Sequence, residues 1–376
     1  MKVKINNFIP LRIINFILFF FKKLFFKKLN KSPRNIVVYR PGNLGDLICA
    51  IPSFYSIRVH FPDSKIYLVT SKGTGKWGAS EIFNKKYFFD EIIDYSITDT
   101  KSLHGKYNLI KKLRSLDIDL WIDYGNQINN FFMYLRQIFI IKISKAKSAW
   151  CDKCIYFGYF VNYQNNNFIF LNETQRLNHF IESNGVQLVY PPLDIMHDDY
   201  YNNSILNSKS DYAVISIGSE QSHLNFWHVE KFVDLINYLS NKIEIVIIGS
   251  PNEIKKAKEI TSKLDKKPIN LVGLTTIQNL FSIFKNSKLV FGLDTGTQHI
   301  ASFEGTNVVT ITSCWNYLNT WTPEGNGKII TLRNPVQSKQ CLLYIDQNKK
   351  RACINKVNCI ESISSQDAIE ACEQII

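Results

Sequence analysis

Two polar, glycine-containing loops, each directly after an apolar strand-like run, constrain the fold of this chain more than any other feature. The first loop is Arg40–Asp46 (RPGNLGD), which follows Ile36–Tyr39. The second is Asp294–His299 (DTGTQH), which follows Leu289–Gly292. A helical pattern begins after each loop, and turns from a strand into a helix are where open α/β sheets bind ligands. We therefore expect two ligand-binding loops, one in each of two domains that face a cleft.

The pattern between and around these loops alternates between strand and helix, and apolar β-branched runs are typical of buried parallel strands. Before residue 190 we expect strands at Ile36–Tyr39, Ile66–Thr70, Glu91–Tyr95 and within Leu116–Tyr124, and helices at Leu47–Phe61 and Asn130–Ile143. After residue 211 we expect strands at Tyr212–Ile217, Ile243–Ile248, Leu271–Val272, Leu289–Gly292 and Val308–Thr312, with helices at His228–Ser240, Ile277–Phe284 and around His299–Phe303. No element is assigned to residues 151–180.

The length of 376 residues fits two domains, given a typical size of about 150 residues per domain. Residues 191–210 are rich in Pro, Asn, Asp and Ser with little periodicity, which is typical of a linker. We predict an α/β fold of two doubly wound Rossmann-like domains at 34–190 and 211–360. A last helix within 361–376 could return to the first domain.

The N-terminal segment, residues 1–33, carries most of the chain's positive charge. Nine Lys or Arg and no acid lie within residues 1–35, so the formal charge of +13 falls to +4 for the rest. A nucleic-acid surface on the folded body is therefore not indicated. The apolar run Ile13–Phe21 is shorter than the ~20 residues that span a bilayer, and no small-residue cleavage site follows it. We expect residues 1–30 to lie on an anionic membrane surface, at the inner face of the plasma membrane. The alternative is a helix packed on the body with a solvated lysine face.

The eight cysteines are expected to be reduced thiols of a cytoplasmic protein, since no secretion signal accompanies them. Cys151 and Cys154 have the spacing of half a zinc site, but a second close pair is missing. Ordinary thiols are therefore favoured over a structural metal, and no metal site is predicted.

Three stretches resemble the heptosyltransferase family of lipopolysaccharide core biosynthesis, which is glycosyltransferase family 9 with a GT-B fold. They are Gly42–Thr70 (GNLGDLICAIPSFYSIRVHFPDSKIYLVT), Leu271–Ser313 and, more weakly, Ile215–Glu253. The loops do not fit the GxGxxG dinucleotide fingerprint. The resemblance implies inverting, metal-independent and cofactor-free transfer of a sugar, expected to be heptose from ADP-heptose, to a lipopolysaccharide inner-core acceptor. The alternatives are a relative that uses another nucleotide sugar and glycan acceptor, and a non-catalytic homologue that binds lipid or a partner.

The resemblance assigns the general base to Asp46, which would take the proton of the acceptor hydroxyl. The residues alone leave another interpretation open, in which Asp46 is a helix N-cap whose backbone bonds lower its pKa. Gly42, Asn43 and Gly45 would form the acceptor-side loop, where the glycines allow a tight turn.

The second loop would bind the donor, because backbone amides at a helix N-terminus can hold a diphosphate. By resemblance, the donor-binding residues are Ser219, Glu253 for the ribose, Thr275 near the adenine, and Asp294, Thr295, Gly296, Thr297 and His299. For His299, packing on a helix face is the alternative. The family often has a lysine two residues before the tryptophan that corresponds to Trp227, where this chain has Asn225. His223, another basic residue or nothing could replace it, which leaves the donor open.

Basic residues of the first domain could meet an anionic acceptor, although most such charges are solvated. They are Lys101, Lys106, Lys111, Lys112, Arg114, Arg136, Lys142, Lys145 and Lys147.

Overall fold

The computed structural model describes residues 26–29, 32–71, 78–83, 85–125, 131–151, 160–164, 167–193, 195–196, 206, 211–218, 227–313, 319–334 and 359–376. The chain divides into two compact units, Met1–Ile195 and Met196–Ile376, and the division falls within the 191–210 linker. Residues 1–25, which hold the apolar N-terminal run, lie outside the described part.

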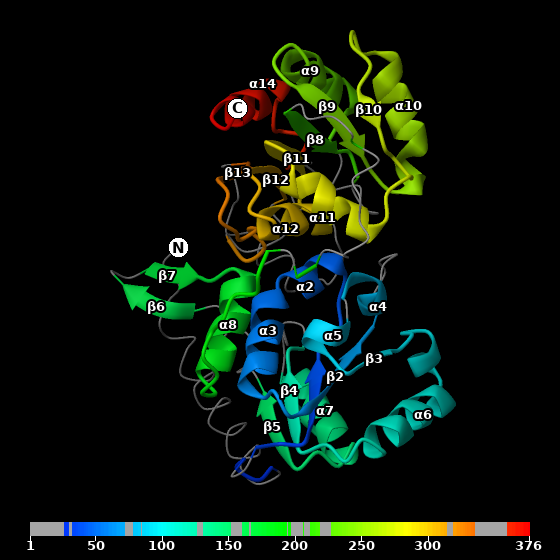
Figure 1. The fold of residues 1–376 in the computed structure, drawn as a ribbon, viewed down its shortest axis with the longest axis vertical. Coiled ribbons are helices and arrows are strands. Elements are labelled where there is room, and N and C mark those ends of the chain that lie inside the picture. The colour runs from blue at the N-terminus through cyan, green and yellow to red at the C-terminus, as the bar shows by residue number, and fades with distance from the viewer. Residues whose placement is uncertain are drawn as a thin grey trace. The chain divides into compact units, whose positions relative to one another are not determined.

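The first unit is built on a parallel sheet with the strand order β3-β2-β1-β4-β5 (Figure 1). Its strands are β1 (Asn35–Tyr39), β2 (Lys65–Thr70), β3 (Glu91–Asp94), β4 (Leu120–Asp123) and β5 (Ser148–Cys151), and an antiparallel hairpin pairs β6 (Phe160–Gln164) with β7 (Asn167–Phe170). Its helices are α2 (Leu44–Ile48), α3 (Ile51–His60), α4 (Ala79–Ile82), α5 (Lys85–Phe88), α6 (Leu103–Arg114), α7 (Phe131–Ile143) and α8 (Glu173–Glu182), with a 3₁₀ turn η2 (Asp99–Lys101).

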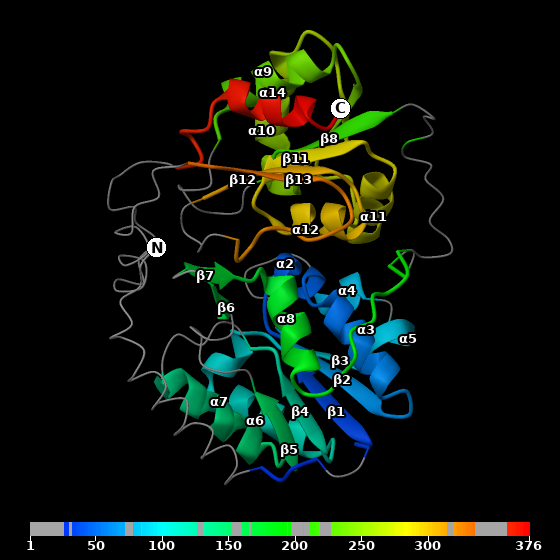
Figure 2. The same ribbon diagram turned by 90° about the vertical axis from the view of Figure 1, so that its left-hand side faces the viewer.

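Helices cover both faces of this sheet, with α3 and α8 on one face and α6 and α7 on the other (Figure 2). On the α7 face, Trp121 of β4 is fully buried in a cluster that includes Ile138 and Ile141. On the α3 face, the ring of Tyr124 lies 5.7 Å from that of Phe54. Burial on both faces explains why the strands are nearly continuous apolar runs.

Phe26, the first described residue, is itself buried in the cluster on the α7 face. The backbone N–H of Lys27 donates to the carbonyl of Lys147 at 3.1 Å. The chain is therefore anchored to the first unit from residue 26 onward. No helix within the described ranges is long and apolar enough to cross a membrane.

The second unit repeats the plan with a parallel sheet of order β10-β9-β8-β11-β12-β13. Its strands are β8 (Tyr212–Ser216), β9 (Glu244–Ile248), β10 (Ile269–Asn270), β11 (Leu289–Leu293), β12 (Val308–Thr312) and β13 (Ile329–Arg333). Its helices are α9 (Val229–Leu239), α10 (Ile254–Ser262), α11 (Ile277–Lys285), α12 (Gly296–Phe303) and α14 (Ser365–Glu373), with a 3₁₀ turn η3 (Pro251–Glu253). The prediction of two doubly wound Rossmann-like domains is confirmed.

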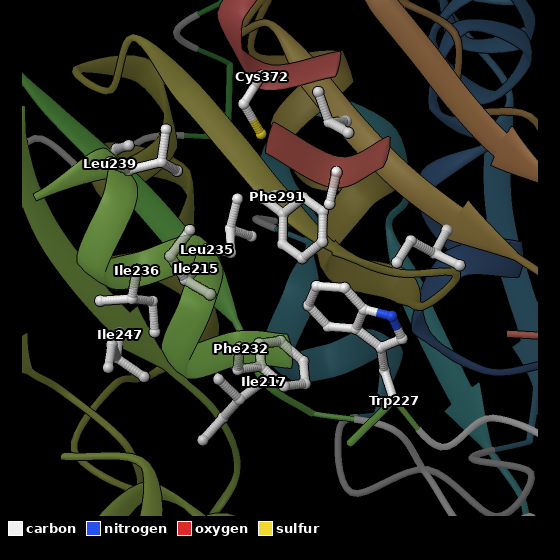
Figure 3. Packing of buried hydrophobic residues seen from close by; sticks show 14 of the residues in the cluster. Ile215, Ile217, Trp227, Phe232, Leu235, Ile236, Leu239, Ile247, Phe291 and Cys372 are labelled. Atoms are coloured by element: carbon white, nitrogen blue, oxygen red, sulfur yellow. The ribbon is translucent and has the colours of Figure 1, made fainter. Parts of the chain in front are cut away.

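A buried tryptophan organises the core of the second unit (Figure 3). The ring of Trp227 lies 4.7 Å from that of Phe232 and 5.3 Å from that of Phe291. Its Nε1 donates to the carbonyl of Ile363 at 2.9 Å, which ties the C-terminal segment to this core. Cys372 of α14 is buried in the same cluster. The last helix could have returned to the first domain, but its apolar face instead completes the core of the second.

Two predicted elements differ in detail. The helix expected at Leu47–Phe61 is divided into α2 and α3, because Pro52 lacks an N–H and is accommodated in the first turn of a new helix. The short strand expected at Leu271–Val272 lies at Ile269–Asn270, in register with β9.

Candidate functional site

The first predicted loop leaves the sheet where the strand order reverses. The strands β1 and β4 are neighbours there, and Tyr39 is in register with Asp123. Ligands of doubly wound sheets bind at this point, outside the carboxyl ends of the strands. The loop passes from Tyr39 through Arg40 and Gly42 into the short helix α2.

Asp46 is the third residue of α2 and not its N-cap, which is Asn43. Asp46 Oδ2 accepts a hydrogen bond from the backbone N–H of Asn43 at 2.8 Å, so its carboxylate reaches back over the start of the helix. The side chain of Asp46 is 18% exposed. The N-cap alternative is therefore wrong about position, and a held carboxylate stays accessible at the end of β1.

Gly42 makes room for this carboxylate. Its φ of 154° lies in a region that side chains rarely adopt. A Cβ at this position would lie 2.6 Å from both Cβ and Cγ of Asp46. The glycine is thus required by both the backbone and the Asp46 side chain.

An ion network that sequence analysis missed lies behind Asp46. Arg40 is fully buried, and its Nη2 lies 2.8 Å from Glu173 Oε1 and 3.5 Å from Asp46 Oδ1. Its Nη1 donates to the carbonyl of Tyr124 at 2.9 Å. Arg176 donates to both oxygens of Glu173, at 2.9 and 2.7 Å. Two arginines thus compensate two carboxylates, as burial of charge requires.

The environment of Asp46 favours its protonated form. Burial raises the pKa of Asp46, the positive charge of Arg40 and the N–H of Asn43 act against this, and the negative charge of Glu173 raises it further. The direction is opposite to that expected for an N-cap. A carboxylate with a raised pKa is a better proton acceptor. Burial also raises the pKa of the nearby Cys49, which stays a neutral thiol.

The second predicted loop lies at the corresponding place in the second unit, where β8 and β11 are neighbours. Thr295 is the N-cap of α12 and Gly296 its first residue. A chain of hydroxyl groups crosses the two strand ends, since Thr297 Oγ1 lies 3.1 Å from Ser216 Oγ and 2.8 Å from Thr295 Oγ1. The structure therefore brings Thr295, Gly296 and Thr297 together at a helix N-terminus, as predicted.

Gln298, the residue of this motif that sequence analysis did not select, is fully buried. Its amide group lies over Gly292, where a Cβ would come within 2.4 Å of Gln298 Nε2 and 2.9 Å of Ser216 Cβ. Within the described ranges, Gln298 Oε1 is buried without a hydrogen-bond partner. Gly292 within β11 could have indicated this contact from the sequence, because a glycine in the interior of a strand often marks a place where another group approaches the backbone closely.

Glu253, which follows β9, lies next to the end of β8, and its contact with a ribose stays a prediction. Its Oε2 accepts from the backbone N–H of Ser250 at 2.6 Å, and a Cβ on Gly218 would lie 3.6 Å from its carboxylate. One turn later, Lys256 Nζ donates to the carbonyl of Ile217 at 3.1 Å. Burial lowers the pKa of Lys256 to about 8. This lysine, at the turn after β8, was not predicted from the sequence.

The structure also describes the positions of His299, Asp294 and Thr275, three more residues that were predicted to bind the donor. His299 is buried in α12, with its ring 6.3 Å from that of Trp321, so the packing alternative describes its position. Asp294 is half-buried at the end of β11, and Thr275 is half-buried before α11. Ligand contact by these three residues stays a prediction. The positions of Ser219, His223, Asn225 and Cys154 lie outside the described residues.

Some of the basic residues of the first unit form contacts within that unit. Lys147 pairs with Asp119 at 2.8 Å, and Lys112 pairs with Glu91 at 3.2 Å. Arg114 Nε donates to the carbonyl of Ile143 at 2.6 Å, and all nine of these basic side chains are exposed. In the part of the chain that the structure describes, no cluster of His, Cys, Asp or Glu could hold a metal ion, and the four described cysteines form no disulfide.

Comparison with known proteins supports the family resemblance. The model of glycosyltransferase family 9 (heptosyltransferase) matches residues 175–350. A lipopolysaccharide core heptosyltransferase of Haemophilus influenzae is 27% identical over 147 residues, which are 38% of this chain and 42% of that protein. The chain thus matches less than half the length of this curated relative.

Two solved structures share the fold. A glycosyl transferase family 9 protein of Veillonella parvula has a TM-score of 0.64 at 17% identity, covering 91% of this chain and 97% of that one. The ADP-heptose lipopolysaccharide heptosyltransferase II of E. coli has a TM-score of 0.61 at 14% identity, covering 91% and 98%. The resemblance to this family and the GT-B fold class are confirmed.

Proposed function

From the match of residues 175–350 to glycosyltransferase family 9, we propose that this chain is an inverting glycosyltransferase. It transfers a sugar, heptose from ADP-heptose, to a lipopolysaccharide inner-core acceptor. The observation that carries the proposal is the environment of Asp46, whose carboxylate lies at the switch point of a Rossmann-like sheet. A backbone hydrogen bond holds this carboxylate in place, its side chain is partly exposed, and burial raises its pKa.

In the proposed reaction, Asp46 accepts the proton of an acceptor hydroxyl while that oxygen attacks the anomeric carbon. The bond from this carbon to the diphosphate oxygen breaks on the opposite face, so the configuration inverts and ADP leaves. Asp46 then returns its proton to solvent. The hydrogen bond from Asn43 and the shape of Gly42 fix the carboxylate during this step.

The second unit would bind the donor. The amides at the start of α12 and the hydroxyls of Thr295 and Thr297 offer hydrogen bonds to the diphosphate, and the helix dipole favours its negative charge. Glu253 would accept from the ribose hydroxyls, while Ser219, Thr275, Asp294 and His299 complete the donor site. We propose that no metal or other cofactor takes part, so excess EDTA should leave turnover unchanged.

Residues 1–30 would hold the enzyme on the anionic inner face of the plasma membrane, near a lipid-linked acceptor. The described part of the first unit adds a surface of matching chemistry on α6. There Leu103 is 85% and Tyr107 63% exposed, beside the exposed Lys106 and Lys111. Apolar side chains among lysines are typical of contact with an anionic leaflet.

Because Phe26 belongs to the core, the membrane test should remove residues 1–25 only. We expect this variant to fold and to sediment less with vesicles that contain phosphatidylglycerol. Equal sedimentation of the two proteins would contradict the role of the N-terminal segment.

The choice of donor is tested by thermal shift and by transfer. We expect ADP-heptose to raise Tm and UDP-sugars not to, and we expect turnover with an inner-core acceptor. Asn225, which stands where the family often has lysine, favours a relative with another nucleotide sugar as the second candidate. Stabilisation by UDP-sugars alone would establish that candidate, and stabilisation by no nucleotide would support a non-catalytic homologue.

A further inference from the structure

The carboxylates of Asp46 and Glu173 compete for one arginine. Arg40 Nη2 is 2.8 Å from Glu173 but 3.5 Å from the carboxylate of Asp46. Nε and Nη2 of Arg40 instead donate to the backbone carbonyl of Asp46, at 3.2 and 3.1 Å. With Nη1 bound to Tyr124, the short contacts of the guanidinium go to Glu173 and to backbone carbonyls, and its ion pair with the Asp46 carboxylate is the longer one.

We propose that Glu173, held by Arg176, is a positioning residue that draws Arg40 away from the Asp46 carboxylate and thereby keeps Asp46 able to accept a proton. This inference rests on the proposed role of Asp46 as the base. It assigns a function to α8, whose first residue, Glu173, lies 127 positions after Asp46 in the sequence.

The physical reason is the strength of a close arginine–carboxylate pair. Such a pair lowers a carboxyl pKa by about 1–3 units and weakens the group as a base. In the observed arrangement, Glu173 takes the close contact with Arg40, and its negative charge raises the pKa of Asp46. Burial is the largest cause of the raised pKa of Asp46, and the Asn43 N–H opposes it. Because the nearby Cys49 is a neutral thiol, the balance between charged groups lies between Arg40 and Glu173.

Arg176 keeps Glu173 charged in this buried place. Its guanidinium donates to both Glu173 oxygens, and the two side chains are 4% and 2% exposed. Glu173 is also the first residue of α8, where the helix dipole favours a negative charge. A neutral Glu173 would leave Asp46 as the one carboxylate paired with Arg40 among the described residues.

The decisive variant is Glu173→Gln, which keeps the shape of the side chain but removes its charge and one of the two oxygens that accept from the arginines. The pKa of Asp46 is read directly from the pH dependence of its ¹³C carboxyl signal, assigned by comparison with Asp46→Asn. We expect the midpoint to fall by about one pH unit or more. Glu182→Gln, the same change at the exposed end of α8, should leave the midpoint in place.

In turnover, the acidic limb of the pH profile should move to lower pH by the same amount in Glu173→Gln. Arg176→Lys keeps the charge and should shift it less. An unchanged Asp46 midpoint in folded Glu173→Gln would overturn the inference. If Glu173→Gln does not fold, Glu173→Asp, whose shorter side chain withdraws from Arg40, must lower the midpoint, or the inference fails.

The titration separates this inference from the proposed function. A midpoint that moves as expected in a protein that transfers no sugar would leave the arrangement standing and refute the enzyme. Normal turnover in wild type with an unmoved midpoint in the variant would refute the role of Glu173 alone.

Discussion

In each sheet the strand order reverses between two neighbouring strands, β1 and β4 in the first unit and β8 and β11 in the second. The polar loop follows β1 in the first unit and β11 in the second, and the two loops differ in their chemistry. At the end of β1, a buried network of full charges surrounds Asp46. At the end of β11, the hydroxyls of Ser216, Thr295 and Thr297 form a neutral chain in front of a helix N-terminus. A proton acceptor needs charged neighbours that tune its pKa, whereas an anion is best received by fixed dipoles. The fold supplies the place, and the residues after the strand decide its use.

The ends of β1 and β11 also share a structural feature. A glycine lies under a polar side chain in each unit, Gly42 under Asp46 and Gly292 under Gln298. Each glycine lets a side chain from the following helix lie against the strand end. The comparison therefore predicts that substitutions at the first end change proton transfer, and those at the second end change donor binding.

The largest effect is expected at Asp46. Asp46→Asn keeps the size of the side chain but cannot accept the proton, so kcat should fall by about 10²–10⁴-fold. Binding of ADP-heptose, measured by calorimetry, should stay nearly the same. Turnover comparable to wild type would rule out Asp46 as the base. It would also contradict the assignment of proton transfer to the loop after β1.

Gly42→Ala tests whether the position of Asp46 matters beyond its presence. The added Cβ must displace the Asp46 side chain, so kcat should fall by roughly 10²-fold, the scale on which a 1 Å misplacement acts. Gly185→Ala is the control, because Gly185 also has positive φ, at 87°, but no atom within 4 Å of a new Cβ. Both variants should lose stability through backbone strain, and only the first should lose turnover beyond that. Equal kcat values would show that Gly42 serves the backbone alone.

Thr297→Val tests the neutral chain of hydroxyl groups at the end of β11, because it removes one hydroxyl and keeps the shape of the side chain. We expect ADP-heptose to bind about 5–10-fold more weakly, the equivalent of one ordinary hydrogen bond, with the pH profile unchanged. In Thr310→Val the same change removes a buried hydroxyl for which no partner exists among the described residues, and affinity should stay constant. A shift of the pH profile in Thr297→Val would contradict the prediction that this loop acts in donor binding and not in proton transfer.

The smallest expected effect is on stability. Because the pKa of Asp46 is raised in the folded state, its ionised form costs stability in full above that pKa, and the cost declines as the pH falls from that pKa toward the ordinary aspartate value. Asp46→Asn, which resembles the protonated form, should therefore have a slightly higher Tm than wild type at pH 7. Thermal scans should show the difference shrinking toward acidic pH. A difference that grows on acidification would mean that the pKa is lowered instead.

Much of the fold could be predicted because its signals are local. The strands at Ile36–Tyr39 and Leu289–Gly292 are short apolar runs that end in glycine and polar residues, and the helices after them have apolar periodicity. Elements with weaker local signals were not predicted. They include β5, the β6–β7 hairpin, α6, α8, α10 and β13. Helix α6 has only one fully buried residue, Leu113, so its apolar pattern is weak.

The local pattern was enough to place Asp46 and Thr295–Thr297 at the ends of strands, because each position follows from the residues immediately around it. The surroundings of these residues come from segments that are remote in the sequence. The pKa of Asp46 is raised by burial and by the charge of Glu173, and the last helix packs its apolar face on the core around Trp227. Electrostatic and packing energies depend on distance in space, and distance in space between remote segments is what a pattern along one chain does not contain.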